Sequence, residues 1–305
     1  MRPEPSPKVR WPKRFKRALR YGLIRIAAGV LGALSIRLAA RLGELLGGLA
    51  FTLARGERRK ALSSLATAFP LSGEKEREAL GRAAFRHLGR CMFELVCVRQ
   101  IDQNPEAFIE WPKADQAALD AALARKKGVL FISGHVGNWE LLARRVALAG
   151  YPCQTIAKET SDPRLTAWVE AFRASANLKA IWRGRPSAVK EMLRALKHGE
   201  ILGLLIDQDT NVQSVWVPFF GQPAKTPRAA ADLALRTGAA VMLGFCQRDA
   251  RGVYQLRMHE LALEPHDTPE SLTARMTAEI EAVIRAHPEQ WVWMHRRWRS
   301  LPPTS

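Results

Sequence analysis

Three short apolar segments constrain the fold of this chain more than any other feature. They are GVLFIS (128–133), ILGLLI (201–206) and AVMLGF (240–245), and each has the length of a buried strand. Stretches with helical spacing lie between them. Strands that alternate with helices predict an α/β fold with a mainly parallel or mixed central sheet, covered by helices on both faces.

Three further segments are strand candidates. PCQTIA (152–157) and LKAIW (178–182) are weaker candidates, whereas VYQLRM (253–258) alternates as a half-buried strand does. Before the first strand, residues 56–70 and 72–98 have helical spacing. We therefore expect helices first and then a sheet built of at least six strands.

Positive charge is concentrated at the N-terminus. The 305 residues carry 47 Lys and Arg against 29 Asp and Glu, a net charge of +18, and residues 1–60 alone contribute +12. A basic arm is followed by a stretch rich in Leu, Ile and Ala from Tyr21 to Ala54. No linker divides residues 100–305, so the chain is predicted to consist of a basic arm and helical region, 1–54, and one α/β domain, 55–305.

The apolar stretch predicts a helix that lies in a membrane interface. Its longest charge-free runs hold only 11 and 10 residues, whereas about 20 are needed to span a bilayer. At about 100° per residue, Arg37, Arg41, Glu44 and Arg55 share one narrow arc, and the rest of the surface is apolar. A partly inserted span and a helix buried in the protein core remain alternatives.

The residues before this stretch fit an anionic surface. Trp11 and Phe15 could sit at headgroup depth, among basic side chains that would meet lipid headgroups. These basic residues are Lys8, Arg10, Lys13, Arg14, Lys16, Arg17 and Arg20.

A turn after the first strand holds the strongest candidate for catalysis. His135 lies between Gly134 and Gly137, and small neighbours would let a substrate approach the imidazole of a general base. Glu140 follows five residues later and could orient His135 if His135 lies in the turn before the helix. The alternative is a His that caps a helix beside a solvated Glu.

The segment HVGNWELL (135–142) resembles the motif of a His and an acid separated by four residues in glycerolipid-type acyltransferases. Its NWE core is similar to the bacterial lipid A biosynthesis acyltransferase family, which adds secondary lauroyl or myristoyl chains. Four more segments resemble blocks of this family in the same order. They are ERRKALSSLATAFP (57–70), KHGEILGLLIDQD (197–209), VWVPFFGQPAKTP (215–227) and PEQWVWMHRRWR (288–299).

This resemblance implies transfer of a fatty acyl chain from an acyl-acyl carrier protein thioester to a hydroxyl of a lipid A precursor or similar glycolipid. His135 would remove the hydroxyl proton and Glu140 would orient His135, at the cytoplasmic face of the bacterial inner membrane. Acyl carrier protein, an anionic lipid acceptor and the membrane surface are then the expected partners. No GxSxG nucleophile motif occurs, consistent with direct transfer.

Acidic and basic residues elsewhere are candidates for substrate contact. Asp207 and Asp209 follow a predicted buried strand, where they could fix Arg or His around the site, contact substrate or bind a cation; we favour the first. Arg183 and Arg185 follow another strand candidate and could hold a phosphate or the thioester oxygen. Solvated surface arginines are the alternative.

The remaining candidates lie beside the His–acid pair and near the C-terminus. Asn138 and Trp139 are expected to contact substrate, as are His295, Arg296 and Arg297. Trp and Arg side chains in this last segment suit core packing or a lipid headgroup better than stacked bases. Neither the His nor the four Cys residues have the spacing of a metal site, so no metal and no cofactor are expected.

Two alternatives to the lipid A hypothesis remain. One is an acyltransferase that acts on another membrane lipid, such as a glycolipid, an ornithine lipid or a lysophospholipid. The other is a basic protein without catalytic activity that binds membranes or nucleic acid, although no nucleic-acid partner is expected.

Overall fold

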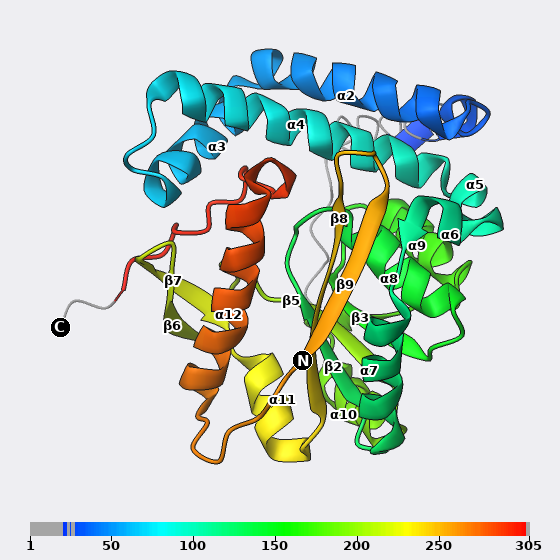
Figure 1. Ribbon diagram of the computed structural model, residues 1–305, viewed down its shortest axis with the longest axis vertical. Helices are drawn as coiled ribbons and strands as arrows, with labels where there is room; N and C mark the ends of the chain where they lie inside the picture. The colour runs from blue at the N-terminus through cyan, green and yellow to red at the C-terminus, as the bar shows by residue number, and fades with distance from the viewer. Residues whose placement is uncertain (1–20, 23–24, 26–27, 303–305) are drawn as a thin grey trace, which may run out of the picture.

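A seven-stranded sheet forms the centre of the computed structural model, which describes residues 21–22, 25 and 28–302 (Figure 1). The strands are β1 (Ile109–Glu110), β2 (Val129–Ser133), β3 (Cys153–Lys158), β4 (Lys179–Arg183), β5 (Ile201–Leu205), β8 (Ala240–Arg248) and β9 (Tyr254–Leu261). Their order is β1-β9-β8-β2-β5-β3-β4, and only the β8–β9 pair is antiparallel. The predicted α/β class with a mostly parallel sheet is confirmed, as are all six strand candidates.

The sequence analysis missed a separate two-stranded hairpin. It consists of β6 (Ser214–Phe219) and β7 (Gln222–Pro227), which pair antiparallel outside the main sheet. Proline residues interrupt its apolar alternation, so the pattern of a strand is weak there. Thr226 and Pro227 end β7, and the Thr226 hydroxyl donates to the Ala224 carbonyl.

Helices surround the sheet and extend beyond one end of it. They are α2 (Ile36–Leu53), α3 (Arg55–Ala68), α4 (Glu74–Val96), α5 (Val98–Gln103), α6 (Pro105–Phe108), α7 (Lys113–Ala124), α8 (Trp139–Leu148), α9 (Pro163–Ala174), α10 (Ala188–Lys197), α11 (Ala229–Thr237), α12 (Pro269–Ala286) and the 3-10 turn η1 (Pro288–Gln290).

The two faces of the sheet bury different sets of side chains, because successive residues of a strand point to opposite sides. Leu130 and Ile132 of β2 belong to the core that includes α11 and α12. Val129 and Phe131 belong to the core that includes α7 and α8. Helices therefore cover both faces and leave the ends of the strands for loops.

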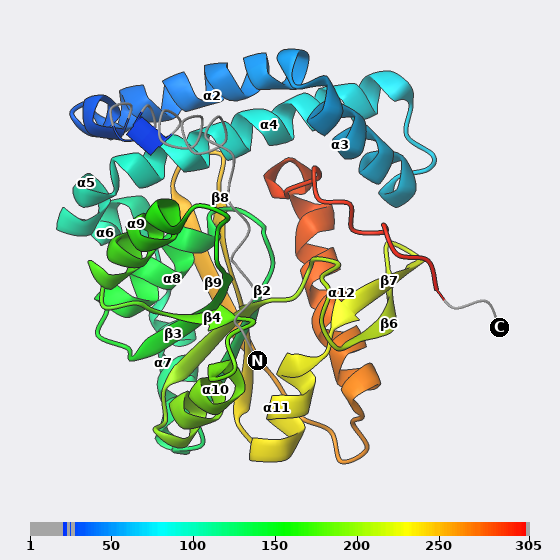
Figure 2. The same cartoon turned by 180° about the vertical axis from the view of Figure 1, so that it is seen from behind.

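Helices α2 and α4 lie side by side across one end of the molecule (Figures 1 and 2). Glycines allow this close contact. A Cβ atom on Gly47 would lie 2.2 Å from the Phe85 carbonyl oxygen, and one on Gly89 would lie 2.2 Å from the Gly43 carbonyl oxygen. The two backbones thus touch where any larger residue would force them apart.

The opposite side of α2 is apolar and exposed. The side chains of this outer face are 44–69% exposed, and they are Leu38, Leu45, Leu46, Leu49 and Leu53. No helix among the described residues combines the length and the apolar character needed to cross a bilayer. The basic residues of the arm, from Lys8 to Arg20, lie outside the described residues, and the division at residue 54 stays a prediction.

We predict that Gly47→Ala lowers the free energy of unfolding by about 1–3 kcal/mol, because the new methyl group overlaps the Phe85 carbonyl. Gly56→Ala on α3 is the control, since no atom lies within 4 Å of its added Cβ, and it should stabilise by up to about 1 kcal/mol. Chemical denaturation measures both. Equal effects of the two substitutions would contradict the close contact of α2 and α4.

Candidate active site

Two neighbouring parallel strands bring the candidate base and an acid together. Ser133 at the end of β2 pairs with Leu205 at the end of β5. Both strands end at the same edge of the sheet, so the residues that follow lie next to each other. His135 and Asp207, 72 positions apart in the chain, meet at this edge.

The turn that carries His135 depends on glycine. Gly137 has a φ of 62°, and a Cβ atom there would lie 2.0 Å from the Cys246 carbonyl oxygen. That same carbonyl accepts a hydrogen bond of 2.9 Å from the Asn138 N–H. The Asn138 side chain accepts from the Leu141 N–H and so caps α8, which fixes where the turn ends.

Asp207 holds His135 by two hydrogen bonds. Its Oδ1 lies 2.7 Å from His135 Nδ1, and its Oδ2 accepts from the His135 backbone N–H at 2.6 Å. The indole N–H of Trp291 donates to the same Oδ2 at 2.8 Å. With Asp207 only 1% exposed, this buried carboxylate fixes both the backbone and the ring of His135.

The charge of Asp207 is stabilised where it is buried. Burial alone would raise the pKa of Asp207, but the charge of His135 and the hydrogen bonds from His135 and Trp291 outweigh burial and lower it to about 2. A carboxylate at Nδ1 favours the tautomer with the proton on that nitrogen. The lone pair of Nε2 then points away from Asp207 and can accept a proton.

Gln208 links His135 to a second imidazole. Its side-chain nitrogen lies 2.9 Å from His135 Nε2 and 2.5 Å from His295 Nε2. Burial and the nearby His135 lower the pKa of His295, which favours its neutral form. The same Gln208 nitrogen lies 3.1 Å from His135 Nδ1, so the Gln208 amide sits over the face of the His135 ring rather than in line with the Nε2 lone pair.

The role predicted for Glu140 needs correction. Glu140 forms an ion pair with Arg173 of α9, with an Oε1–Nη2 distance of 2.5 Å and a second contact of 3.2 Å. Asp207 instead makes the contact with His135 that the sequence assigned to Glu140. The sequence analysis placed Asp207 after a buried strand and favoured a role in fixing Arg or His, and the structure agrees with that role.

Asp209, Arg183 and Arg185 do not join the pair formed by His135 and Asp207. Asp209 accepts from the Ser300 N–H and lies 3.4 Å from Arg299, so it holds the C-terminal segment. Arg185 forms an exposed ion pair with Glu159. Arg183 ends β4 at the same edge of the sheet, but three strands from β2.

The three candidate residues near the C-terminus, His295, Arg296 and Arg297, lie in different surroundings. The His135 ring contacts Trp139, with ring centroids 4.9 Å apart, and His295, with centroids 5.4 Å apart. Arg297 is fully buried and donates to the Lys225 carbonyl and the Thr226 hydroxyl, so it supports the β6–β7 hairpin rather than substrate. Arg296 is exposed.

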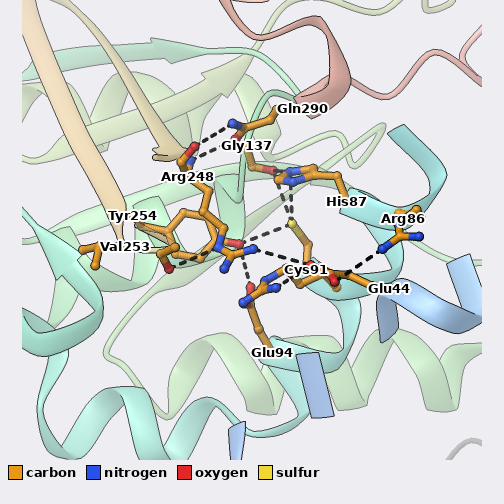
Figure 3. Close-up of polar contacts among 12 residues, drawn as sticks. Glu44, Arg86, His87, Cys91, Glu94, Gly137, Arg248, Val253, Tyr254 and Gln290 are labelled. Atoms are coloured by element: carbon orange, nitrogen blue, oxygen red, sulfur yellow. Dashed lines mark hydrogen bonds and ion pairs between the residues drawn. The ribbon is translucent and has the colours of Figure 1, made fainter. Parts of the chain in front are cut away.

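Behind the turn lies a second polar cluster that the sequence analysis missed (Figure 3). His87 Nε2 lies 3.3 Å from the Gly137 carbonyl oxygen and 3.3 Å from Cys91 Sγ. The Gly137 N–H donates to the Gln290 carbonyl at 2.8 Å. A single His on a long helix gives no sequence signal for such a contact, because its partner is a backbone atom 50 residues away.

No group of three or more His, Cys, Asp or Glu side chains is arranged to hold a metal ion within the part of the chain that the structure describes. The absence of a metal and of a cofactor stays a prediction.

Comparison with known proteins identifies the family. The model of the bacterial lipid A biosynthesis acyltransferase family matches residues 6–300. The chain belongs to this family. It is therefore an acyltransferase, as the resemblance implied.

Named relatives of this acyltransferase cover most of its length. The lipid A biosynthesis lauroyltransferase of Escherichia coli (strain K12) is 26% identical over 93% of each chain. The lipid A biosynthesis palmitoleoyltransferase of the same organism is 27% identical over 86% of this chain and 85% of the relative. A phosphatidylinositol mannoside acyltransferase of Mycobacterium tuberculosis (strain CDC 1551 / Oshkosh) is 24% identical over 59% of this chain and 57% of the relative.

We predict that His87 makes the stability of this acyltransferase sensitive to acid. Burial lowers the pKa of His87 from 6.5 to about 4, so between these values the unfolded chain binds a proton that the folded chain does not. The stabilisation is present above pH 6.5 and is lost as the pH falls to about 4, a difference of about 3 kcal/mol.

Chemical denaturation across this pH range measures the effect. His87→Gln should lose less stability than the wild type as the pH falls, whereas His266→Gln, at an exposed loop position, should follow the wild type. An unchanged pH dependence in His87→Gln would contradict a buried neutral His87.

Proposed function

We propose that this acyltransferase moves a fatty acyl group from an acyl-acyl carrier protein thioester to a hydroxyl of a lipid A precursor or similar membrane glycolipid. The observation that carries the proposal is the Asp207–His135 contact at the edge of the sheet. Acyl transfer to a lipid acceptor is the activity common to the family and to its named relatives.

His135 acts as the general base in this mechanism. The acceptor hydroxyl approaches Nε2 in the plane of the ring, and its proton moves to Nε2 as the oxygen attacks the thioester carbonyl carbon. The resulting imidazolium is stabilised by the Asp207 carboxylate at Nδ1. When the carbon–sulfur bond breaks, the thiolate takes the proton from Nε2, which restores neutral His135 and releases the carrier thiol.

The identity of the acceptor rests on the relatives. Matches to lipid A acyltransferases cover most of this chain, and this favours a lipid A precursor. The match to a phosphatidylinositol mannoside acyltransferase favours the runner-up, a different membrane glycolipid. Either acceptor is consistent with the net charge of +18, because acidic carrier proteins and anionic lipids are both attracted to a basic protein.

The outer face of α2 supports a reaction at a membrane surface. Five exposed leucines on one helix form an apolar surface whose contact with water is unfavourable. We place this face in the interfacial region at the cytoplasmic side of the bacterial inner membrane, where acyl carrier protein can deliver its thioester. Neither a cofactor nor a nucleic acid takes part in the proposed reaction.

Mass spectrometry of lipid extracts tests the proposal. Cells that contain the protein should hold one lipid class whose mass exceeds that in cells without it by one acyl group. His135→Ala should abolish this increment, and also transfer from acyl-acyl carrier protein by the purified protein, while the variant stays in the membrane fraction. His266→Ala, at an exposed loop position, should keep both activities.

Retention of the mass increment by His135→Ala would contradict the proposed base. An increment on a lipid that carries no sugar would replace the glycolipid acceptor with the runner-up class of lysophospholipids or ornithine lipids.

A further inference from the structure

A cavity of about 550 Å³ lies between α2, α4 and the β8–β9 hairpin. Five of its lining residues are arginines and two are glutamates, an excess of three positive charges. The arginines are Arg37, Arg41, Arg90, Arg248 and Arg251. We call it the arginine cavity.

The glutamates neutralise only part of this charge. Glu44 is shared by three arginines: it forms a hydrogen bond with Arg90 and lies 3.6 Å from Arg248 and 3.9 Å from Arg86. Figure 3 shows Glu44, Glu94 and Arg248 directed toward one another. One carboxylate cannot balance three guanidinium groups, so the ion pair of Arg248 with Glu44 leaves part of the Arg248 charge for a further anion.

The second glutamate is already used by the protein. Glu94 accepts from Arg90 at 2.8 Å and from the Tyr254 hydroxyl at 2.6 Å. Arg251 is paired with Glu110 and Asp249, outside the cavity. Of the five arginines, Arg90 and Arg251 are therefore neutralised, and Arg248 shares Glu44 with Arg90 and Arg86.

Arg37 and Arg41 are the least neutralised of the five. Neither has an ion pair among residues 21–22, 25 and 28–302, and both are exposed. They lie one helical turn apart on α2, which places both side chains on the same side of the helix and beside the cavity. Guanidinium groups in this arrangement are suited to a phosphate, whose oxygens accept several N–H donors.

The position of these arginines favours a lipid over a free anion. At about 100° per residue, Arg41 lies about 40° from Arg37 around α2, and Leu45 of the outer face lies about 40° further. The two arginines thus separate the exposed apolar face from the cavity. The cavity also has an apolar side, formed by residues such as Ile101, Phe108 and Val253, which a lipid backbone could contact.

We propose that the arginine cavity binds the phosphate group of an anionic lipid headgroup. Arg37 and Arg41 bind the phosphate at the entrance of the cavity, and Arg248 binds it from the β8–β9 hairpin. The lipid enters from the membrane that the outer face of α2 contacts, so this inference rests on the proposed membrane attachment and not on the proposed reaction. The site is distinct from His135, which is not among the residues that line the cavity.

Hydrogen bonds connect the β8–β9 side of the cavity to the turn that carries His135. The Arg248 backbone N–H donates to the Gln290 side chain at 2.9 Å, and Gln290 donates back to the Arg248 carbonyl. The backbone carbonyl of Gln290 accepts from Gly137. A lipid headgroup bound at Arg248 would thus fix the position of His135 relative to the bilayer.

Binding of soluble lipids to the detergent-solubilised full chain tests this site. The probes are dihexanoyl phosphatidic acid, dihexanoylglycerol, which lacks the phosphate, and glycerol phosphate, which lacks the acyl chains. We expect phosphatidic acid to bind more tightly than both. The double variant Arg37→Gln with Arg41→Gln should raise its Kd by about tenfold or more, because each lost contact is a charge-assisted hydrogen bond.

A matched double variant on α3 controls for net charge. Arg55 and Arg59 are also exposed and one helical turn apart, but they do not line the cavity. Arg55→Gln with Arg59→Gln should leave the Kd within about twofold of the wild type, since exposed charges away from the ligand are screened. Thermal unfolding of both double variants shows that each is folded.

Three results would overturn the proposal. Equal Kd values for the two double variants would mean that Arg37 and Arg41 do not bind the phosphate. Equal binding of dihexanoylglycerol would mean that the phosphate is not recognised, and equal binding of glycerol phosphate would make the cavity a site for a free anion. The assay involves no acyl transfer, so its failure is separate from a failure of the proposed reaction.

Discussion

The Asp207 carboxylate is the group on which the arrangement of the candidate active site depends. Three N–H groups converge on it, two from His135 and one from Trp291. They come from the end of β2 and from the C-terminal segment, and Asp207 itself follows β5. Because the carboxylate is buried and keeps its charge, separating these segments would leave an uncompensated charge, so the contacts hold all three together.

The turn that carries His135 is held from both sides. On the His135 side, Asp207 fixes the imidazole, and the Gln208 amide nitrogen packs against the ring, 2.9 Å from Nε2 and 3.1 Å from Nδ1. On the other side, the Gly137 carbonyl contacts His87, and the Gly137 N–H donates to the Gln290 carbonyl. In the proposed mechanism, a turn fixed in this way presents His135 without needing a substrate to order it, which is the preorganisation that general base catalysis favours.

The sequence predicted the sheet better than it predicted the site. Apolar strands of the main sheet were found because burial on both faces leaves a continuous apolar run, whereas the prolines of the β6–β7 hairpin hide its alternation. His135 was found from its glycine neighbours and from the family motif.

The partner of His135 was assigned to the wrong acid, because spacing along the chain favoured Glu140. The neighbour order of β2 and β5, which brings Asp207 to His135, is a property of topology that no local pattern encodes. Arg173, the actual partner of Glu140, lies on a different helix 33 positions away. His87 was missed for the same reason, since it contacts a distant backbone atom.

The most direct measurement compares kcat/KM for acyl transfer in Asp207→Asn and Glu140→Gln, with thermal unfolding to show that both variants are folded. Asn at position 207 can hold the wrong tautomer of His135, so the account predicts a loss of about 10³-fold or more. Glu140→Gln should stay within about tenfold of the wild type, because Glu140 binds Arg173 rather than the base. An equal or larger loss in Glu140→Gln, or near-normal activity in Asp207→Asn, would contradict the account.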